Sequence, residues 1–211
     1  MMKTIPILLV TIFCYQYSFA QKNSFGIKTV AISANQVKKM DTIANSYNQT
    51  LETQTLFSFG AGVFYKAALK TGWMLTADFN FIVVGSRNKF VTESMLLNPD
   101  GKTHYYKDKI GYIELPVMLQ YNTGKLYMGF GPGIALKLFS KITDFEPNIS
   151  FKTKNYKKID FGLNTLIGYK ISKQIELNLR YYYGLANIHK QDPYMRTTNQ
   201  FSGLSILYCI Q

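Results

Sequence analysis

The sequence lacks long apolar runs and contains few cysteines and histidines. No stretch of 18 apolar residues occurs among its 211 residues, which excludes a membrane-spanning helix. The only histidines, His104 and His189, lie far apart, without clustered carboxylates and outside any Ser/His/Asp pattern. Such residues make neither a metal site nor an activated nucleophile. The sequence therefore predicts no metal, no cofactor and no enzymatic activity.

The first residues have the pattern of an export signal. Lys3 gives a small positive start, Ile5–Phe13 forms a short apolar core, and Ser18-Phe19-Ala20 places small residues before a cleavage point. The apolar core is shorter than the ~20 residues that a spanning helix requires. We predict that residues 1–20 are a cleaved signal peptide and that residues 21–211 form a single barrel domain.

Cleavage would leave one cysteine in the mature chain. It removes Lys3 and Cys14, so the formal charge falls from +12 to +11 and Cys209 remains alone. An exported chain with a single cysteine forms no internal disulfide and depends on other interactions for its stability. Cys209 lies in an apolar terminal segment, where we expect a buried or lipid-facing thiol rather than a nucleophile.

Short and long connections alternate along the chain. The short, mostly Gly-marked turns are Lys70–Gly72, Asn122–Gly124 and Ser172–Lys173. The expected long polar loops are Asn35–Thr53, Arg87–Lys107, Ser140–Asn155 and Ile188–Thr197. Short turns at one end of a sheet and long loops at the other are typical of a membrane-spanning β-barrel, with the long loops outside.

Between these connections, apolar and polar residues alternate with period two, as strand geometry requires. This pattern predicts eight strands, Ser24–Ala34, Leu56–Ala68, Trp73–Gly85, Gly111–Tyr121, Lys125–Phe139, Lys158–Ile171, Gln174–Ala186 and Gln200–Ile210. One face of the strands is continuously apolar, and the chain contains 16 Tyr and 15 Phe, enough for aromatic girdles. We predict an all-β, eight-stranded antiparallel up-and-down transmembrane barrel in the outer membrane. A soluble, lipocalin-like barrel is the structural alternative.

Several stretches resemble one family of outer-membrane barrels. Tyr112–Tyr121 reads YIELPVMLQY and resembles the Y-[IL]-E-[IL]-P-x-x-x-[KQ]-Y strand of the PorT-like β-barrels of Bacteroidetes. Gly129–Gly133 resembles the G-x-G-P strand of that family, and Asp160–Gly162, Gly168–Tyr169 and Arg180–Leu185 resemble its closing strands. The resemblance covers essentially the whole mature chain and implies an eight-stranded barrel of a Gram-negative outer membrane. Some relatives are linked to gliding or protein secretion, but no motif here carries that role.

The polar face of the predicted strands is rich in charges of both signs. Its charged residues are Lys66, Asp78, Glu114, Lys137, Asp160, Lys170, Glu176 and Arg180. Buried charges need partners. We expect Glu114 to pair with Arg180 in the middle of the lumen, with Asp78 competing, and Lys66, Glu176 and Lys170 to cluster near the short turns. These residues would fill the narrow interior of an eight-stranded barrel, and an ion gate is the alternative interpretation.

Two prolines lie inside predicted strands of a closed barrel, where no edge is available. Proline cannot donate to a ladder and is usually confined to edges or bulges. We therefore expect Pro116 to mark a bulge, with a similar irregularity at Pro132.

The charge balance is basic, with 24 Lys and Arg against 12 Asp and Glu. For an exported barrel, anionic lipid is a more accessible partner than nucleic acid. Lys152, Lys154, Lys157 and Lys158 cluster near the third long loop, where they would contact lipopolysaccharide phosphates or serve only as a solvated surface. We expect a monomeric structural or interaction protein that acts through its long loops, with envelope or secretion proteins as partners. A narrow pore for small solutes and a lipid-modifying enzyme are the alternatives.

Overall fold

The computed structural model describes residues 23–40, 49–69, 72–92, 104–144, 150–152, 156–190 and 195–210. The predicted signal peptide, residues 1–20, lies outside these ranges. Within them, no helix is long and apolar enough to cross a membrane.

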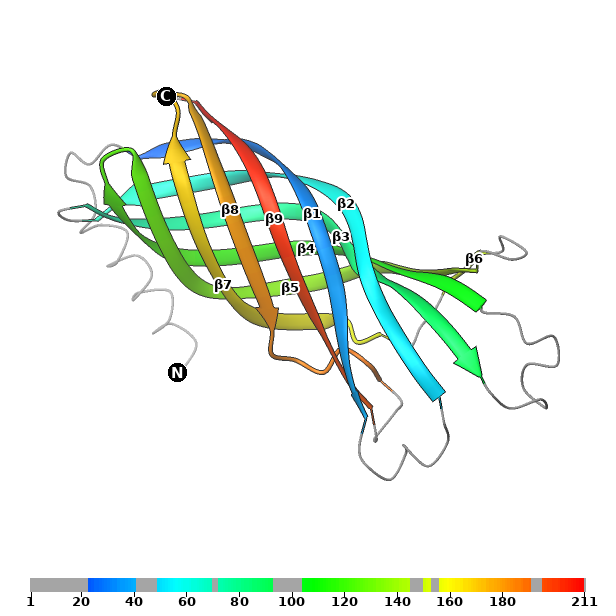
Figure 1. Ribbon diagram of the computed structural model, residues 1–211. Coiled ribbons are helices and arrows are strands. Elements are labelled where there is room, and N and C mark those ends of the chain that lie inside the picture. Colours follow the sequence, from blue (N-terminus) through cyan, green and yellow to red (C-terminus); the bar gives the residue numbers. More distant parts are fainter. Residues whose placement is uncertain are drawn as a thin grey trace, which may run out of the picture.

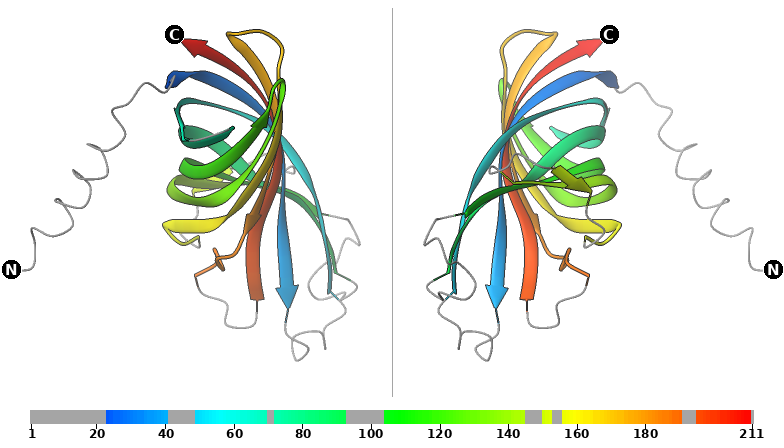
Figure 2. Two further views of the ribbon diagram at one scale, coloured as in Figure 1. Left: turned by 90° about the vertical axis from the view of Figure 1, so that its left-hand side faces the viewer. Right: turned by 90° about the vertical axis from the view of Figure 1, so that its right-hand side faces the viewer.

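The chain forms a closed antiparallel β-barrel (Figures 1 and 2). Its strands are β1 (Ser24–Met40), β2 (Gln49–Ala68), β3 (Trp73–Thr92), β4 (His104–Thr123), β5 (Leu126–Asp144), β6 (Ser150–Lys152), β7 (Ile159–Lys170), β8 (Ile175–Gly184) and β9 (Met195–Ile210). Neighbours follow the order β4-β3-β2-β1-β9-β8-β7-β5-β6, and β4 also pairs with β5. Eight strands therefore form the ring, and the three-residue β6 adds only to β5. The predicted fold class is confirmed.

The short turns lie at the same end of the barrel as the beginning of β1 and the end of β9. Ser24 of β1 is opposite Lys66, two residues before the end of β2, and Phe25 is opposite Ile210. Gly72 and Gly124 have φ angles of 86° and 89° at two of the turns. Glycine adopts such angles without a steric penalty, which explains why these turns are tight.

The strands extend further toward the loop side than the sequence predicted. β2, β3 and β4 each contain 20 residues. At a rise of roughly 3.3 Å per residue, 20 residues span about 66 Å, well beyond the ~25 Å apolar band even when the strand is tilted. We call the polar parts beyond the band, residues 35–40, 49–55, 86–92, 104–109, 140–144, 150–152 and 195–200, the strand extension.

The predictions of the four long loops are therefore wrong in part. Much of Asn35–Thr53, Arg87–Lys107 and Ser140–Asn155 is strand, and β9 begins at Met195, inside the expected Ile188–Thr197 loop. These segments pair with neighbouring strands although they lack an apolar face. Period-two alternation of apolar residues therefore gave no signal there.

The predicted bulge at Pro116 is also wrong. β4 keeps one register with β5 from Tyr112, opposite Lys137, through Pro116, opposite Gly133. The register shift instead lies between Gly111 and Tyr112. Gly111 lies against the outward-facing ring of Phe139, and a Cβ at this position would come 2.2 Å from that ring. Pro132 also stays in register with β7. A second shift occurs between Thr55 and Gly60 of β2.

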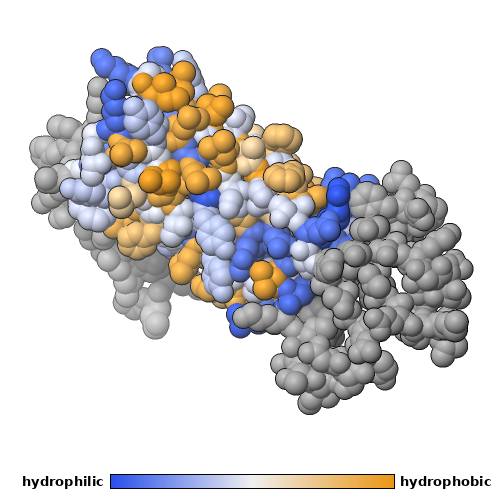
Figure 3. Space-filling view, in the orientation of Figure 1, coloured by the Kyte–Doolittle hydropathy of each residue, from blue (hydrophilic) through white to orange (hydrophobic). Residues whose placement is uncertain are grey.

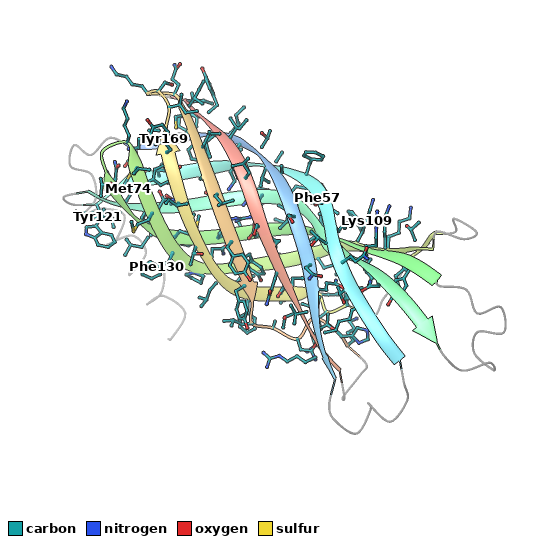
Figure 4. All side chains as sticks on the ribbon, viewed as in Figure 1. Phe57, Met74, Lys109, Tyr121, Phe130 and Tyr169 are labelled. Carbon is teal, nitrogen blue, oxygen red and sulfur yellow. The ribbon has the colours of Figure 1, made fainter. Side chains whose placement is uncertain are left out.

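Apolar side chains face outward and polar side chains face the lumen. Phe57 and Phe59 are 79% and 77% exposed, whereas Glu114 is 0% exposed. Apolar residues spread over the barrel surface, and hydrophilic residues gather toward the loop side (Figure 3). Figure 4 places Tyr121 and Tyr169 near the short-turn end, and Phe57 and Lys109 toward the loop side. A soluble barrel has the opposite polarity, so the lipocalin-like alternative is excluded.

Candidate functional site

An ion pair crosses the middle of the lumen. Arg180 of β8 donates two hydrogen bonds to Glu114 of β4, from Nη1 to Oε1 at 3.1 Å and from Nη2 to Oε2 at 2.9 Å. Asn80 Nδ2 donates to the same carboxylate at 3.3 Å. The structure thus brings together the two residues that the sequence paired. Parallel two-point contacts of this kind fix both side chains strongly.

Asp78 pairs with a residue that the sequence analysis missed. Lys28 Nζ of β1 lies 2.5 Å from Asp78 Oδ2, and both side chains are buried. Asp78 therefore does not compete for Arg180. Lys28 was missed because β1 has the least regular alternation, so its lumen face was not assigned. The signal was available, since Lys28 alternates with the outward residues Phe25, Ile27 and Thr29.

A third buried pair lies near the short turns. Lys66 of β2 pairs with Glu176 of β8, and the Cys209 thiol lies 3.6 Å from the Glu176 carboxylate. Lys170, expected in the same cluster, is half-buried at the end of β7. Cys209 is buried in the lumen, one of the two environments predicted for it.

Aromatic rings and glycines fill the space between the ion pairs. Tyr112, Tyr127 and Tyr182 are almost completely buried. Tyr127 lies over Gly168, where an added Cβ would come 2.1 Å from the ring. Tyr182 stacks on Phe201 with ring centroids 4.8 Å apart. The interior of an eight-stranded barrel is just wide enough for such side chains.

Another polar cluster lies above these rings. Asn199 Nδ2 donates to Asp160 Oδ2 at 2.8 Å and to the Tyr112 hydroxyl at 3.3 Å. Lys137, also expected in the lumen, is half-buried, and its ammonium donates to the carbonyl of Tyr156 at 2.5 Å.

On the loop side, two loop residues fold inward and cover the lumen. Tyr156 and Ile188 are 5% and 0% exposed and pack in one cluster with core residues that include Ile82, Val84 and Ile110. The two loops are joined because Lys157 N donates to the Ile188 carbonyl at 2.7 Å. We call Tyr156 and Ile188 the loop cap.

A polar cluster surrounds the loop cap in the strand extension. Lys38 Nζ lies 3.9 Å from Asp108 Oδ2 and donates to Asn88 Oδ1 at 3.1 Å. Burial raises the pKa of the Asp108 carboxyl although Lys38 opposes the shift, and burial lowers the pKa of the Lys38 ammonium. Burial, with the Asp108 charge, raises the pKa of Tyr106 to about 12. These groups connect β1 to β3 and β4 above the membrane.

The remaining predicted residues lie on the surface or outside the described part. Lys157 and Lys158 are exposed, whereas the Lys152 side chain and all of Lys154 lie outside the described residues. The His104 side chain is also outside them, and His189 is half-buried beside Tyr156, with ring centroids 5.9 Å apart. In the described ranges, no group of three or more His, Cys, Asp or Glu residues could hold a metal ion.

Four further basic residues face outward where β3, β4 and β5 leave the apolar band. Arg87, Lys109 and Lys141 are exposed and Lys107 is half-exposed. We call these four residues the basic collar. They were missed because three of them lie in expected loops or at their borders, where no face could be assigned.

Comparisons with solved structures return small outer-membrane barrels. Neisserial surface protein A is 11% identical with a TM-score of 0.44, over 88% of this chain and 98% of that chain. Outer membrane protein W of E. coli is 13% identical with a TM-score of 0.39, over 88% and 97%. Ail, the attachment invasion locus protein of Yersinia pestis, in complex with the heparin analogue sucrose octasulfate, is 13% identical with a TM-score of 0.36, over 87% and 99%.

Sequence comparison assigns the family. A search of curated proteins found no match. The sequence profile described as "Outer membrane protein beta-barrel domain" matches residues 19–190, most of the chain. This match agrees with the closed barrel and its apolar outer surface, and it places the protein in the outer membrane. The chain belongs to the outer membrane protein beta-barrel domain family.

Proposed function

We propose that this protein is a non-conducting outer-membrane barrel with a structural or interaction role, carried by its loop side. The filled lumen is the observation that supports this proposal most directly. Buried ion pairs such as Glu114–Arg180 and Lys66–Glu176 occupy two levels of it, and the loop cap covers it. Ions and solutes would have to displace paired charges and packed rings in order to pass.

The strand extension supports a role outside the membrane. It is polar, and its inward side chains are joined by hydrogen bonds such as Ser86 Oγ to Gln36 Oε1 at 3.0 Å. The strand extension therefore continues the barrel wall beyond the apolar band. Functional residues are often found on loops that a rigid scaffold positions.

The narrower family assignment is part of the same proposal. The YIELPVMLQY motif of Tyr112–Tyr121 supports a PorT-like barrel, and its Glu114 accepts two hydrogen bonds from Arg180 in the lumen. The proposal of a partner among envelope or secretion proteins is supported only by that resemblance. Co-purification from native outer membranes would test for such a partner. The full chain would be compared with a variant that lacks the residues of the strand extension.

Planar-bilayer recordings separate the filled barrel from a narrow pore. We expect the refolded wild-type protein to give no steady single-channel current. The double variant Tyr156→Ala/Ile188→Ala, which trims the loop cap, should also stay closed because the ion pairs below remain. A steady current from the wild-type protein would favour the pore.

The proposal also includes the absence of enzymatic activity. Its support is that Cys209 is buried in the lumen and that His189 packs against Tyr156 instead of a nucleophile. Overexpression should leave the mass spectrum of lipid A unchanged. A new lipid A species that disappears in a His104→Ala or His189→Ala variant would identify a lipid-modifying enzyme instead.

A further inference from the structure

One edge of the strand extension lacks a neighbouring strand among the described residues. β1 pairs with β2 only as far as Ala34, opposite Leu56. Beyond that point β1 continues to Met40 with β9 alone, and β2 continues with β3 alone. Figures 1 and 2 show β1 and β2 parting toward the loop side. Residues Gln49–Thr55 of β2, which we call the β2 edge, therefore have an open side in the described part of the chain.

The parting of β1 and β2 has two local causes. Thr55 is opposite Ser86 and Gly60 is opposite Ile82, so β2 has one more residue than β3 across this interval. A bulge of this kind bends its strand. On β1, the backbone N–H of Gln36 donates to the side chain of its own neighbour Asn35 at 2.8 Å. The Gln36 side chain accepts a hydrogen bond from Ser86 of β3, which holds β1 toward β3 across the lumen.

The register identifies the backbone groups on the open side of β2. β3 keeps one register with β4 along its described length, so the same alternate residues of β3 face β2 throughout. Near the short turn, Leu69 N donates to the Trp73 carbonyl at 2.8 Å, so odd-numbered residues of β2 bind β3 there. The extra residue of β2 reverses this parity, and in the β2 edge the even-numbered residues bind β3. The residues that direct their N–H and C=O groups away from β3 are therefore Gln49, Leu51, Thr53 and Thr55.

Two other edges of the strand extension are covered by the chain itself. The three-residue β6 pairs with Lys141–Thr143 of β5. On β9, the Thr197 carbonyl accepts a hydrogen bond from Ile188 N at 2.9 Å. The β5 edge is an example, within this molecule, of an extended segment that binds this sheet through its backbone.

The β2 edge lacks the residues that usually protect an exposed edge. It reads QTLETQT and contains no Lys, Arg or Pro. Natural sheets use Lys, Pro and bulges to prevent their edges from pairing with other chains. The facing stretch of β1, Asn35–Met40, reads NQVKKM and has two lysines. Its Gln36 N–H is also bound locally. Of these two edges, the β2 edge is therefore the better template for an added strand.

We propose that the β2 edge binds an extended segment of another protein, which adds an antiparallel strand beside β2. Backbone hydrogen bonds would provide the affinity, as in other cases of strand addition. The β2 edge lies in the polar strand extension, which favours a partner in the aqueous phase. Two copies of this chain in one membrane have the same orientation, so their β2 strands would pair in parallel, which is less stable. This inference deepens the proposed interaction role and rests on it.

The test uses the full chain folded in detergent micelles and a synthetic peptide. The probe is a short peptide of alternating Thr and Val with every second amide N-methylated, which blocks one edge and prevents the peptide from pairing with itself. The control peptide is N-methylated at every amide. With saturating probe, we expect amide hydrogen exchange at Thr53 and Thr55 to slow by at least about tenfold, because a new hydrogen bond protects each N–H. The control peptide should leave the exchange unchanged.

Two matched variants locate the site. Thr53→Pro/Thr55→Pro removes two N–H groups from the open side and none that pairs with β3, and proline is tolerated at such edge positions. Thr53→Val/Thr55→Val keeps both N–H groups and is the control. Exchange at Gln49 and Leu51 should respond to the probe in the valine variant and not in the proline variant. A gel-mobility shift on heating would verify that both variants are folded.

Three results would overturn the proposal. One is equal exchange at Thr53 and Thr55 with the probe and with the control peptide. Another is unchanged probe binding in the proline variant, which would place the site elsewhere. The third is slow exchange at these two residues without any peptide. If that protection increases with protein concentration, a second copy covers the edge, and if it does not, the chain covers its own edge.

A failure of this proposal can be distinguished from a failure of the proposed function. A partner that co-purifies equally with the wild-type protein and with the proline variant would keep the interaction role and remove the β2 edge from it. A steady single-channel current would contradict the non-conducting barrel, whether or not the peptide binds.

Discussion

Arg180 and Glu114 are 66 residues apart in the sequence and form a two-point ion pair across the barrel. Their strands, β8 and β4, are separated around the ring by β7 and β5. The pair therefore joins two strands that are not neighbours in the wall, through the lumen. Both side chains are almost fully excluded from solvent, so each charge depends on the other.

Arg180→Ala should destabilise the barrel without opening it. The substitution leaves the Glu114 carboxylate buried, with the Asn80 amide as its one remaining hydrogen-bond donor among the described residues. Breaking one side of a buried ion pair costs about 3–5 kcal/mol. Urea unfolding in micelles would measure this loss, and bilayer recordings should show no steady current. The double variant Arg180→Met/Glu114→Gln should recover part of the stability. A large, steady conductance in Arg180→Ala would contradict the filled lumen.

Lys28 and Arg180 should be energetically coupled. Lys28 pairs with Asp78 and also interacts electrostatically with Arg180 and Glu114. Residues within one such network usually deviate from additivity by about 0.5–3 kcal/mol. A double-mutant cycle with Lys28→Met and Arg180→Met, followed by urea unfolding, would measure the coupling. The cycle of Arg180→Met with Lys66→Met is the comparison, and it should be closer to additive. Equal coupling in both cycles would mean that the lumen charges form one undivided network.

Gly168→Ala should destabilise the barrel because Tyr127 occupies the place of its side chain. The new Cβ would lie 2.1 Å from the ring, and overpacking of this kind costs about 1–3 kcal/mol. Adding Tyr127→Leu should restore most of the loss. Gly133→Ala is the control, since its closest neighbour is the movable end of the Asn164 side chain. Unfolding of the wild type and of these three variants would test the interpretation, and an equal loss in Gly133→Ala would contradict it.

Lys38→Met should raise the pKa of Asp108 further. Burial already raises the pKa of this carboxyl, and the Lys38 ammonium at 3.9 Å opposes the shift. Tyr156, Asn88 and the charge of His189 also lower it and remain in the variant. Titration followed by ¹³C NMR of the Asp108 carboxyl would measure the change. Lys107→Met, on the outer face, should have a smaller effect.

The same shift has a consequence for stability. The pKa of folded Asp108 lies above its ordinary value of 3.8. The folded state therefore binds the proton more tightly than the unfolded chain does, and the resulting stabilisation is lost as the pH rises from that ordinary value through the folded pKa. Asp108→Asn should remove this dependence from the local stability of the strand extension.

Patterns along the chain were sufficient to predict the membrane-embedded half of the molecule. Alternation marks a strand only where one face is apolar, and Trp73–Gly85 and Gln174–Ala186 satisfy that condition. The strand extension does not. Its strands pair through backbone hydrogen bonds and polar contacts such as Gln36–Ser86, which leave no periodic signature in hydrophobicity.

Most of the charged residues that face the lumen could be predicted from the sequence, but only some of their ion pairs could. Glu114 and Arg180 could be matched because both lie at mid-height on regular strands. Lys28 could not be assigned to Asp78 without the register of β1, which depends on its pairing with β2 and β9. The basic collar depends on register in the same way, since Lys109 and Lys141 become neighbours only across a strand pair.

The pairing of β1 with β9 also constrains when this barrel completes. These two strands are at opposite ends of the chain, and their ladder runs from Phe25 opposite Ile210 to Met40 opposite Met195. Closing contacts between such distant segments is slow relative to local pairing. The ring therefore cannot close until β9 has been exported, and a chain truncated before β9 would leave two long unpaired edges open to aggregation.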